Sequence, residues 1–127
     1  MALIKVFTQA QNREELFTEI AKSIKLIVAA ALNVDSLPTS PANIETVYVE
    51  GIDLIGIEYI IEIIAVERPG QQSIADNFIK GINEVYPDKT FSVYFNNIEE
   101  VGMANTPRSS TQEQSITMKE AIKRCKQ

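Results

Sequence analysis

The sequence predicts an α+β fold in which two β-α-β units form a four-stranded mixed sheet with two helices on one face. Four short runs rich in β-branched and aromatic residues are typical of strands. A longer segment with helical periodicity lies between the two runs of each pair. With 127 residues, of which 45% are hydrophobic and 23% charged, the chain is long enough to bury one core without disulfides.

The first unit consists of strands at residues 3–8 and 44–50 and the helix between them. Asn12, followed by Glu15 three positions later, resembles a capping box, so we expect the helix to begin there and to end at Asn33. A loop with two prolines follows. The apolar face expected for this helix consists of Leu16, Phe17, Ile20, Ala21, Ile24, Ile27, Val28 and Ala31.

The second unit consists of strands at residues 59–66 and 90–96 and a helix at 71–85. Strands that are separated by a helix pair in parallel within each unit. A turn, GIDLIG at residues 51–56, joins the units; its two glycines lack the dinucleotide-binding spacing and no helix follows directly, so it is not a cofactor loop. The second helix is expected to bury Ile74, Phe78, Ile79, Ile82 and Val85.

The C-terminal part differs in composition from the rest of the chain. We expect a domain at residues 1–106, then a polar linker and a short basic helix at 107–127. Met118, Ile122 and Cys125 have i, i+4, i+7 spacing, which places them on one helical face. The sequence leaves open whether this helix is a docked or solvated appendage or binds a partner.

The composition excludes several kinds of site. The chain has no histidine, which excludes Ser-His-Asp and Cys-His catalysis and histidine-bearing zinc or iron sites. Its single cysteine, Cys125, forms no internal disulfide and no Cys-only zinc site. We therefore expect no cofactor and no metal, and chemistry must come from carboxylates, Lys, Arg, Tyr or the terminal amine.

Charge and hydropathy limit the partners. A formal net charge of −5 argues against nucleic acid, whose phosphates need a basic stripe. No apolar run approaches the length of a membrane span, so no membrane partner is expected. The N-terminus, MALIKVFTQAQ, lacks the apolar region of a signal peptide, which favours a cytoplasmic location.

The third strand is apolar on both faces, because Ile60, Ile64 and Val66 alternate with other apolar residues. Helices can cover only one face of a four-stranded sheet in this arrangement. We therefore expect the other face to be buried by another copy of the chain, which makes the protein a homo-oligomer.

Two charged residues of the second unit are candidates for a site. Glu62 lies in mid-strand among isoleucines, a costly position unless it is paired. It is either a catalytic carboxylate with a raised pKa or the partner of Lys5 inside the oligomer. Arg68 stands before a helix start, which favours anions, and its fork suits a carboxylate. A surface ion pair with Glu67 or Asp76, or a subunit contact, are the alternatives for Arg68.

Further candidates lie outside that stretch. Arg13, at the start of the first helix, is a possible substrate-binding residue or simply solvated. Tyr94 and Tyr48 are possible donors to a substrate carbonyl, or packing residues. The acidic edge of the first helix is expected to be a solvated face and consists of Glu14, Glu15 and Glu19.

This element order and three stretches of sequence resemble the tautomerase superfamily, which includes 4-oxalocrotonate tautomerase and macrophage migration inhibitory factor. A strand opens at residue 2, and Arg13 starts the first helix. PDKTFSVYFNNIEEVGMAN, at 87–105, is similar to the Pro-Asp-Arg…Asn-Val-Gly segment near the end of migration inhibitory factor. The run at 57–76 looks like a bacterial branch with a mid-strand Glu followed by Arg-Gly-Gln.

The resemblance, which covers residues 2–105, implies a trimer whose sheets face inward. It also implies a catalytic N-terminal proline, in whose place this chain has Ala2. Removal of Met1 would leave a primary amine with a pKa of about 7.7–8.0, which an apolar pocket near a cation would lower. Phe91 and Val93 stand where migration inhibitory factor has a tyrosine and an asparagine.

The resemblance implies a tautomerase or isomerase that acts on a small carboxylate-bearing keto–enol substrate. In that hypothesis Ala2 supplies the base, Glu62 a supporting acid, and Arg68 and Arg13 hold the carboxylate, while Tyr94 binds the substrate oxygen. The alternative is a non-catalytic oligomer of the same fold with a binding or structural role. A ferredoxin-like or regulatory ligand-binding domain with the same element order is a third option.

Overall fold

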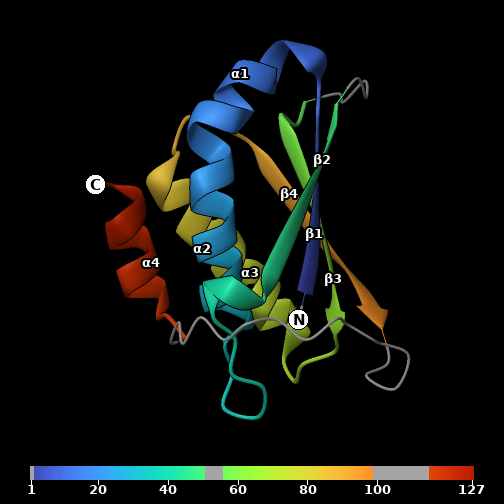
Figure 1. Cartoon of the computed structure of the whole chain (residues 1–127), viewed down its shortest axis with the longest axis vertical. Coiled ribbons are helices and arrows are strands. Elements are labelled where there is room, and N and C mark those ends of the chain that lie inside the picture. The colour runs from blue at the N-terminus through green and yellow to red at the C-terminus, as the bar shows by residue number, and fades with distance from the viewer. Residues whose placement is uncertain (1, 51–55, 99–114) are drawn as a thin grey trace.

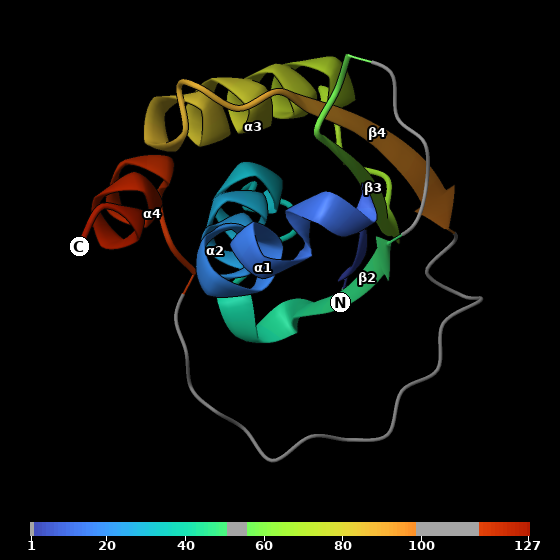
Figure 2. The ribbon, with the colours of Figure 1, turned by 90° about the horizontal axis from the view of Figure 1, so that it is seen from above.

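The computed structural model describes residues 2–50, 56–98 and 115–127. Three predicted segments lie outside the described residues: 51–55 of the GIDLIG turn, 99–105 of the resembling segment, and most of the predicted linker, including the 106/107 boundary. Within the described residues, two layers are present: a sheet on one side and helices on the other (Figures 1 and 2).

The sheet has four strands in the order β2-β1-β3-β4. Its strands are β1 (Ala2–Thr8), β2 (Ile44–Glu50), β3 (Tyr59–Val66) and β4 (Phe91–Ile98). The pairs β1–β2 and β3–β4 are parallel, and β1 and β3 are antiparallel. The predicted mixed sheet of two β-α-β units is thus confirmed, with the last strand two residues longer at its end than expected.

The first long helical segment changes its hydrogen-bond pattern along its length. A 3-10 turn (Ala10–Asn12) leads into α1 (Arg13–Glu15), then a π-helical segment (Leu16–Ile20) and α2 (Ala21–Leu32). The predicted capping box is wrong: Asn12 makes no capping bond, and its Nδ2 donates to Thr8 Oγ1 at 3.2 Å. The helix start is therefore attached to the end of β1 by a side-chain contact.

The second helix, α3, covers Gln71–Val85 as predicted. Gly70 precedes it with φ 72° and ψ 36°, a left-handed conformation that favours glycine. This conformation turns the chain from the end of β3 directly into the helix. In the helix layer α2 and α3 lie on the same side of the sheet (Figure 2).

The core lies between this helix layer and one face of the sheet. Alternate residues of β1 and β3 point into it and are buried, whereas their neighbours are half-buried on the open face. The predicted apolar face of the first helix is largely confirmed, but Phe17 is 48% exposed. The fully buried large side chains of the core include Ile4, Leu16, Ile20, Ile24, Ile27, Leu32, Ile61, Ile63, Phe78 and Ile82.

A short helix, α4 (Met118–Cys125), packs on the outer side of α2 and α3 (Figure 2). Thr117 caps it by accepting a hydrogen bond from the Glu120 N–H at 3.2 Å. Ala121 is fully buried, and Met118, Ile122 and Cys125 pack against the core from the predicted face. In this structure α4 is thus a docked helix; the division into a domain and an appendage stays a prediction.

Candidate functional site

The predicted site residues fall into three places. Ala2 and Arg68 lie at the end of the sheet where β1 begins and β3 ends, since Leu3 is opposite Ile64. Glu62 and Tyr94 lie on the open face in mid-sheet. Arg13 lies at the other end of β1, close to Glu50, which is in register with Thr8.

Ala2 is the first residue of β1, and its methyl group is buried in the core with 1% exposure. Its neighbour in β2 is Ile44, which is also fully buried. The side chain therefore faces the helices rather than the open face. A base at this position has to be the backbone amine, exposed by removal of Met1.

Arg68 is buried, with 4% exposure, and its guanidinium binds neutral oxygens of the chain. Its Nε donates to the Leu32 carbonyl at 2.8 Å, one terminal nitrogen to the Val66 carbonyl at 2.7 Å, and the other to Thr39 Oγ1 at 2.9 Å. Burial lowers the pKa of Arg68 from its usual high value. Arg68, predicted to bind a carboxylate or, as an alternative, to form a surface ion pair, instead joins the end of α2, the end of β3 and the loop that follows α2.

On the open face, Lys5, Glu62 and Tyr94 occupy neighbouring strands in one cross-strand row. Lys5 Nζ lies 4.0 Å from Glu62 Oε1, and Asn96 Nδ2 donates to Glu62 Oε2 at 3.3 Å. Lys5 and Glu62 are thus in contact within one chain, and the location of this pair inside an oligomer stays a prediction. The Glu62 side chain is only 12% exposed even though no helix covers this face in the described part of the chain.

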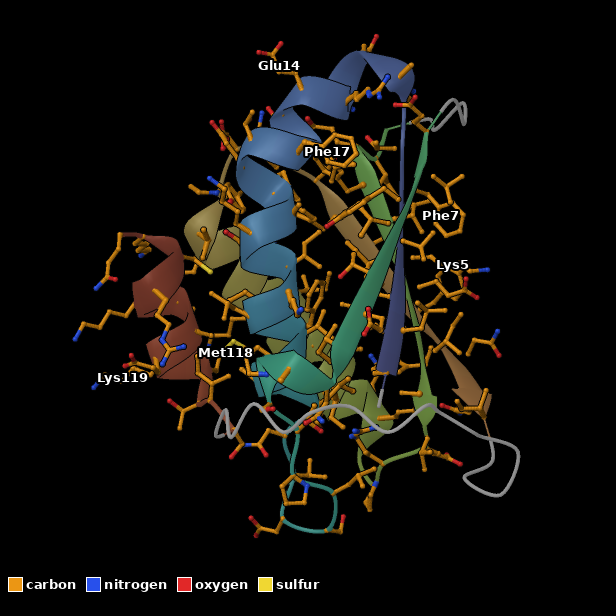
Figure 3. The ribbon with its side chains drawn as sticks, in the orientation of Figure 1. Lys5, Phe7, Glu14, Phe17, Met118 and Lys119 are labelled. Carbon is orange, nitrogen blue, oxygen red and sulfur yellow. The ribbon has the colours of Figure 1, made fainter. Side chains whose placement is uncertain are left out.

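Tyr94 is the most exposed member of this row, with 44% exposure. Loss of hydration raises the pKa of Tyr94, and the charge of Glu62 and a hydrogen bond to it raise the pKa further. The phenol therefore stays protonated and can donate a proton in a hydrogen bond. Lys5 and Phe7 point away from the helices on this same face (Figure 3).

The open face is otherwise largely apolar. Phe7 pairs with Ile60, Leu3 with Ile64, and Lys5 with Val47, which is 44% exposed. An apolar sheet face of this kind, with one ion pair near its centre, is typical of a surface that another chain covers.

Arg13 is the exposed arginine of the two. Its side chain is 65% exposed, and its Nε lies 3.5 Å from Glu50 Oε2. A cavity of about 210 Å³ beside it is lined by Leu16, Phe17, Tyr48 and Glu50 as well. The Phe17 and Tyr48 rings meet edge to face with centroids 5.1 Å apart. This cavity thus combines an arginine paired with Glu50 and an aromatic surface.

Ala2 and Arg13 do not meet within one chain. Six residue steps of β1 separate Ala2 from Thr8, which corresponds to about 20 Å along the strand. Arg13 lies beyond Thr8, at the start of the helical segment. A site that uses both the terminal amine and Arg13 therefore requires a second copy of the chain.

Sequence reasoning missed a charged cluster at the Arg13 end of the sheet. Glu15, expected on a solvated face, accepts a hydrogen bond from the hydroxyl of buried Tyr59 and pairs with Lys89 Nζ at 2.6 Å. Burial alone would raise the pKa of Glu15, but bonds from Lys89 and Tyr59 lower it. The signal in the sequence was weak, because these residues come from three distant segments.

The contact with Glu15 also changes the pKa values of Tyr59 and Lys89. Burial raises the pKa of Tyr59, and its bond to Glu15 and the charges of Glu15, Glu58 and Glu19 raise it further. The bond to Glu15 also raises the pKa of Lys89. The cluster fixes the start of the first helix to β3 and to the turn before β4.

Phe91 and Val93 are packing residues on the helix-facing side of β4. Phe91 stacks on Tyr59 with ring centroids 5.4 Å apart, and Val93 packs against the core. No group of three or more acidic or cysteine side chains that could hold a metal occurs in residues 2–50, 56–98 and 115–127. Among those same residues, no helix has the length and apolar content needed to cross a membrane.

No protein-family model matches the sequence, and no curated protein sequence matches it. Solved structures are similar to it in fold. A fused 4-OT, described as a wild-type symmetric trimer, has a TM-score of 0.57 at 11% identity, covering 94% of this chain and 98% of its own. A native fused 4-OT has a TM-score of 0.55 at 16% identity, over 84% of this chain and 94% of its own.

A domain of unknown function, DUF1904, from Sebaldella termitidis has a TM-score of 0.50 at 20% identity. The match covers 83% of this chain and 95% of that one. The chain therefore has the fold of the fused 4-OT structures, in agreement with the fold expected from its resemblance to the tautomerase superfamily. At these identities the comparisons establish the fold and leave the chemistry to the residues.

Proposed function

We propose that the protein is a homotrimer that binds a small carboxylate-bearing keto–enol compound and moves a proton on it as a tautomerase or isomerase. The observation that carries this proposal is the separation of Ala2 and Arg13 at opposite ends of β1. The open sheet face is also apolar. A second copy of the chain that covers it would bring the Arg13 end of one β1 against the Ala2 end of another. The symmetric trimer of the similar fused 4-OT supports this number of copies.

In this proposal each residue has one role. The Ala2 amine accepts and returns the proton, as a primary amine instead of the family's proline. Arg13 binds the carboxylate, because it is exposed and has only one weak partner among the described residues. Tyr94 supports the site from the open face as a hydrogen-bond donor, and Glu62, the carboxylate paired with Lys5, positions it. Arg68 braces the fold near Ala2, so its contribution to substrate binding is indirect.

The test is the ketonisation of phenylenolpyruvate, followed in wild type, Ala2→Pro and Arg13→Gln. In the family that the sequence resembles, the catalytic base is an N-terminal proline. Ala2→Pro should therefore raise kcat/KM above the wild-type value. Arg13→Gln, made in the Ala2→Pro background, should lower kcat/KM about tenfold, mainly through KM, because a charge-assisted bond is lost. Native mass spectrometry should find a trimer that lacks Met1.

A monomer in solution, or an Ala2→Pro variant without turnover, would contradict the catalytic proposal.

The second candidate is a non-catalytic oligomer with a binding or structural role. The engagement of all three Arg68 nitrogens and the apolar Phe91 and Val93 favour it. The non-catalytic role would be supported if Met1 is retained or the terminal amine is acetylated while ligand binding still depends on Arg13. A cytoplasmic location and the absence of nucleic-acid partners stay predictions.

A further inference from the structure

The cavity beside Arg13 has a lining in which the charges cancel. Arg13 is the cation of this lining and Glu50 its carboxylate, and the other lining residues are Leu16, Phe17 and Tyr48. The Tyr48 hydroxyl adds no charge, because burial raises the pKa of this phenol above its usual value. A ligand that enters the cavity therefore meets one positive and one negative group side by side.

The contact between Arg13 and Glu50 leaves part of the guanidinium available. It joins Arg13 Nε to Glu50 Oε2 at 3.5 Å, and both side chains are well exposed. Among the described residues, the two terminal nitrogens of Arg13 donate no hydrogen bond. These nitrogens can hold one carboxylate in a forked pair, and the Glu50 carboxylate then remains beside the bound ligand.

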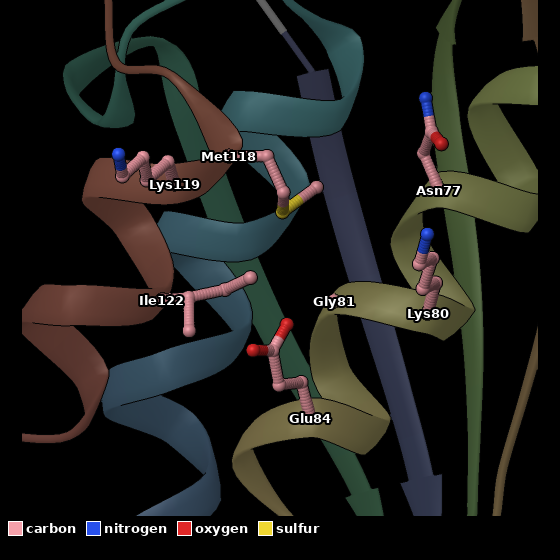
Figure 4. A pocket seen from close by; sticks show the side chains of 7 residues that line it. All are labelled: Asn77, Lys80, Gly81, Glu84, Met118, Lys119 and Ile122. Carbon is pink, nitrogen blue, oxygen red and sulfur yellow. The ribbon is translucent and has the colours of Figure 1, made fainter.

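A second carboxylate on the same ligand would find no cation of its own among the described residues near this cavity. Arg68, the other arginine expected to bind a carboxylate, is 4% exposed, and its three side-chain nitrogens already donate to oxygens of the chain. The larger cavity between α3 and α4 offers no alternative site for an anion. There the Glu84 carboxylate points into the cavity, whereas the Lys119 ammonium points away from it (Figure 4).

We propose that Glu50 determines specificity at this site, so that a compound with a single carboxylate and an apolar body is selected over a dicarboxylate. The inference rests on the proposed binding of a carboxylate by Arg13. The apolar body lies against Phe17 and Tyr48, whose rings meet edge to face, and it covers the side chain of Phe17, which is 48% exposed. A second carboxylate on that body would lose hydration against the rings and would be repelled by Glu50.

The experiment compares two ligands that differ by one carboxylate, hydrocinnamate and para-carboxyhydrocinnamate. Each is titrated into the full chain labelled with ¹³C in its tyrosine rings, and the Tyr48 signal is assigned with Tyr48→Phe. Wild type should bind the monocarboxylate at least about fivefold more tightly than the dicarboxylate. Glu50→Gln should reduce this ratio to below about twofold, because it removes the charge that repels the second carboxylate.

Three further variants control the measurement. Glu50→Asp keeps the negative charge and should keep most of the selectivity. Glu14→Gln should leave the ratio unchanged, because Glu14 follows Arg13 in the same helical turn, is exposed and points away from the sheet (Figure 3). Phe17→Ala should weaken both ligands by a similar factor, since they share the same phenyl body.

The outcomes separate this inference from the proposed function. If Arg13→Gln leaves the binding of hydrocinnamate unchanged, or if wild type does not bind it by about 10 mM, the carboxylate site of the proposed function is wrong and this inference is wrong with it. If Arg13→Gln weakens binding but Glu50→Gln keeps the wild-type ratio, only the specificity role of Glu50 is overturned. An equal change of the ratio in Glu14→Gln would overturn that role as well.

Discussion

One arginine lies near each end of β1, and the two differ in exposure and in their partners. Arg68, where β1 begins, is 4% exposed and donates to two carbonyls and a hydroxyl. Arg13, where β1 ends, is 65% exposed and has one carboxylate partner, at 3.5 Å, among the described residues. Both stand near a helix start, the position that made each a candidate for binding a carboxylate.

The difference comes from what surrounds each guanidinium. Arg68 reaches the last residue of α2, whose carbonyl has no partner within the helix, and gives it a 2.8 Å hydrogen bond beside the longer one, at 3.4 Å, from the Thr39 hydroxyl. Arg13 projects from the first helical turn beside a cavity that is open to solvent. Exposure therefore distinguishes an arginine that can bind a ligand from one that holds the fold, and position in the sequence does not.

The largest expected effect that follows from this comparison is that of Arg68→Met. The substitution removes the Arg68 donor from the Val66 carbonyl and the Thr39 hydroxyl, and leaves the Leu32 carbonyl with only the longer bond from Thr39 at 3.4 Å. Each buried unsatisfied group costs about 1–3 kcal/mol. We expect the free energy of unfolding to fall by about 3 kcal/mol or more in urea denaturation. Arg68→Lys should recover only part of this loss, and a loss under about 1 kcal/mol in Arg68→Met would contradict the bracing role.

An intermediate effect is expected for Glu15→Gln at the Arg13 end. It weakens the bonds to Tyr59 and Lys89, at a cost of about 1–2 kcal/mol near neutral pH. Because folding lowers the pKa of Glu15 below 4.5, its stabilisation is present above that pH and is lost as the pH falls through the lowered value. Urea titrations at a series of pH values should therefore find that acidification lowers the free energy of unfolding less in Glu15→Gln than in wild type.

Tyr59→Phe is the control for that pH series. It removes one donor to Glu15 but keeps the ring that stacks on Phe91. On acidification, its free energy of unfolding should fall less than that of wild type and more than that of Glu15→Gln, because Lys89 still pairs with the carboxylate. Identical pH profiles in all three proteins would show that the cluster does not stabilise the folded state.

The smallest effect on stability is expected for Arg13→Gln. The Arg13–Glu50 pair is exposed, and exposed pairs contribute about 0–1 kcal/mol, so the free energy of unfolding should change by less than about 0.5 kcal/mol. The same urea titration measures it. A loss comparable to that of Arg68→Met would remove the distinction between the two arginines.

Most of the fold could be predicted from local patterns. Strand and helix periodicity located all four strands and both long helices, since the alternation of apolar residues follows directly from backbone geometry. The cross-strand Lys5–Glu62 pair was also predictable, because both side chains occupy mid-strand positions with the same alternation. The capping box failed because Asn12 and Glu15 find partners outside the helix.

By itself, the sequence determined the mixed sheet and the helix layer on one face, and the apolar residues that line the other face. Only the tertiary structure decided which charged side chains are free. Glu15 became a partner of Tyr59 and Lys89, and Arg68 a brace, because residues from distant segments meet there. Periodicity specifies the face on which a residue lies, whereas the partner of a charge depends on chain segments that meet only in the folded state.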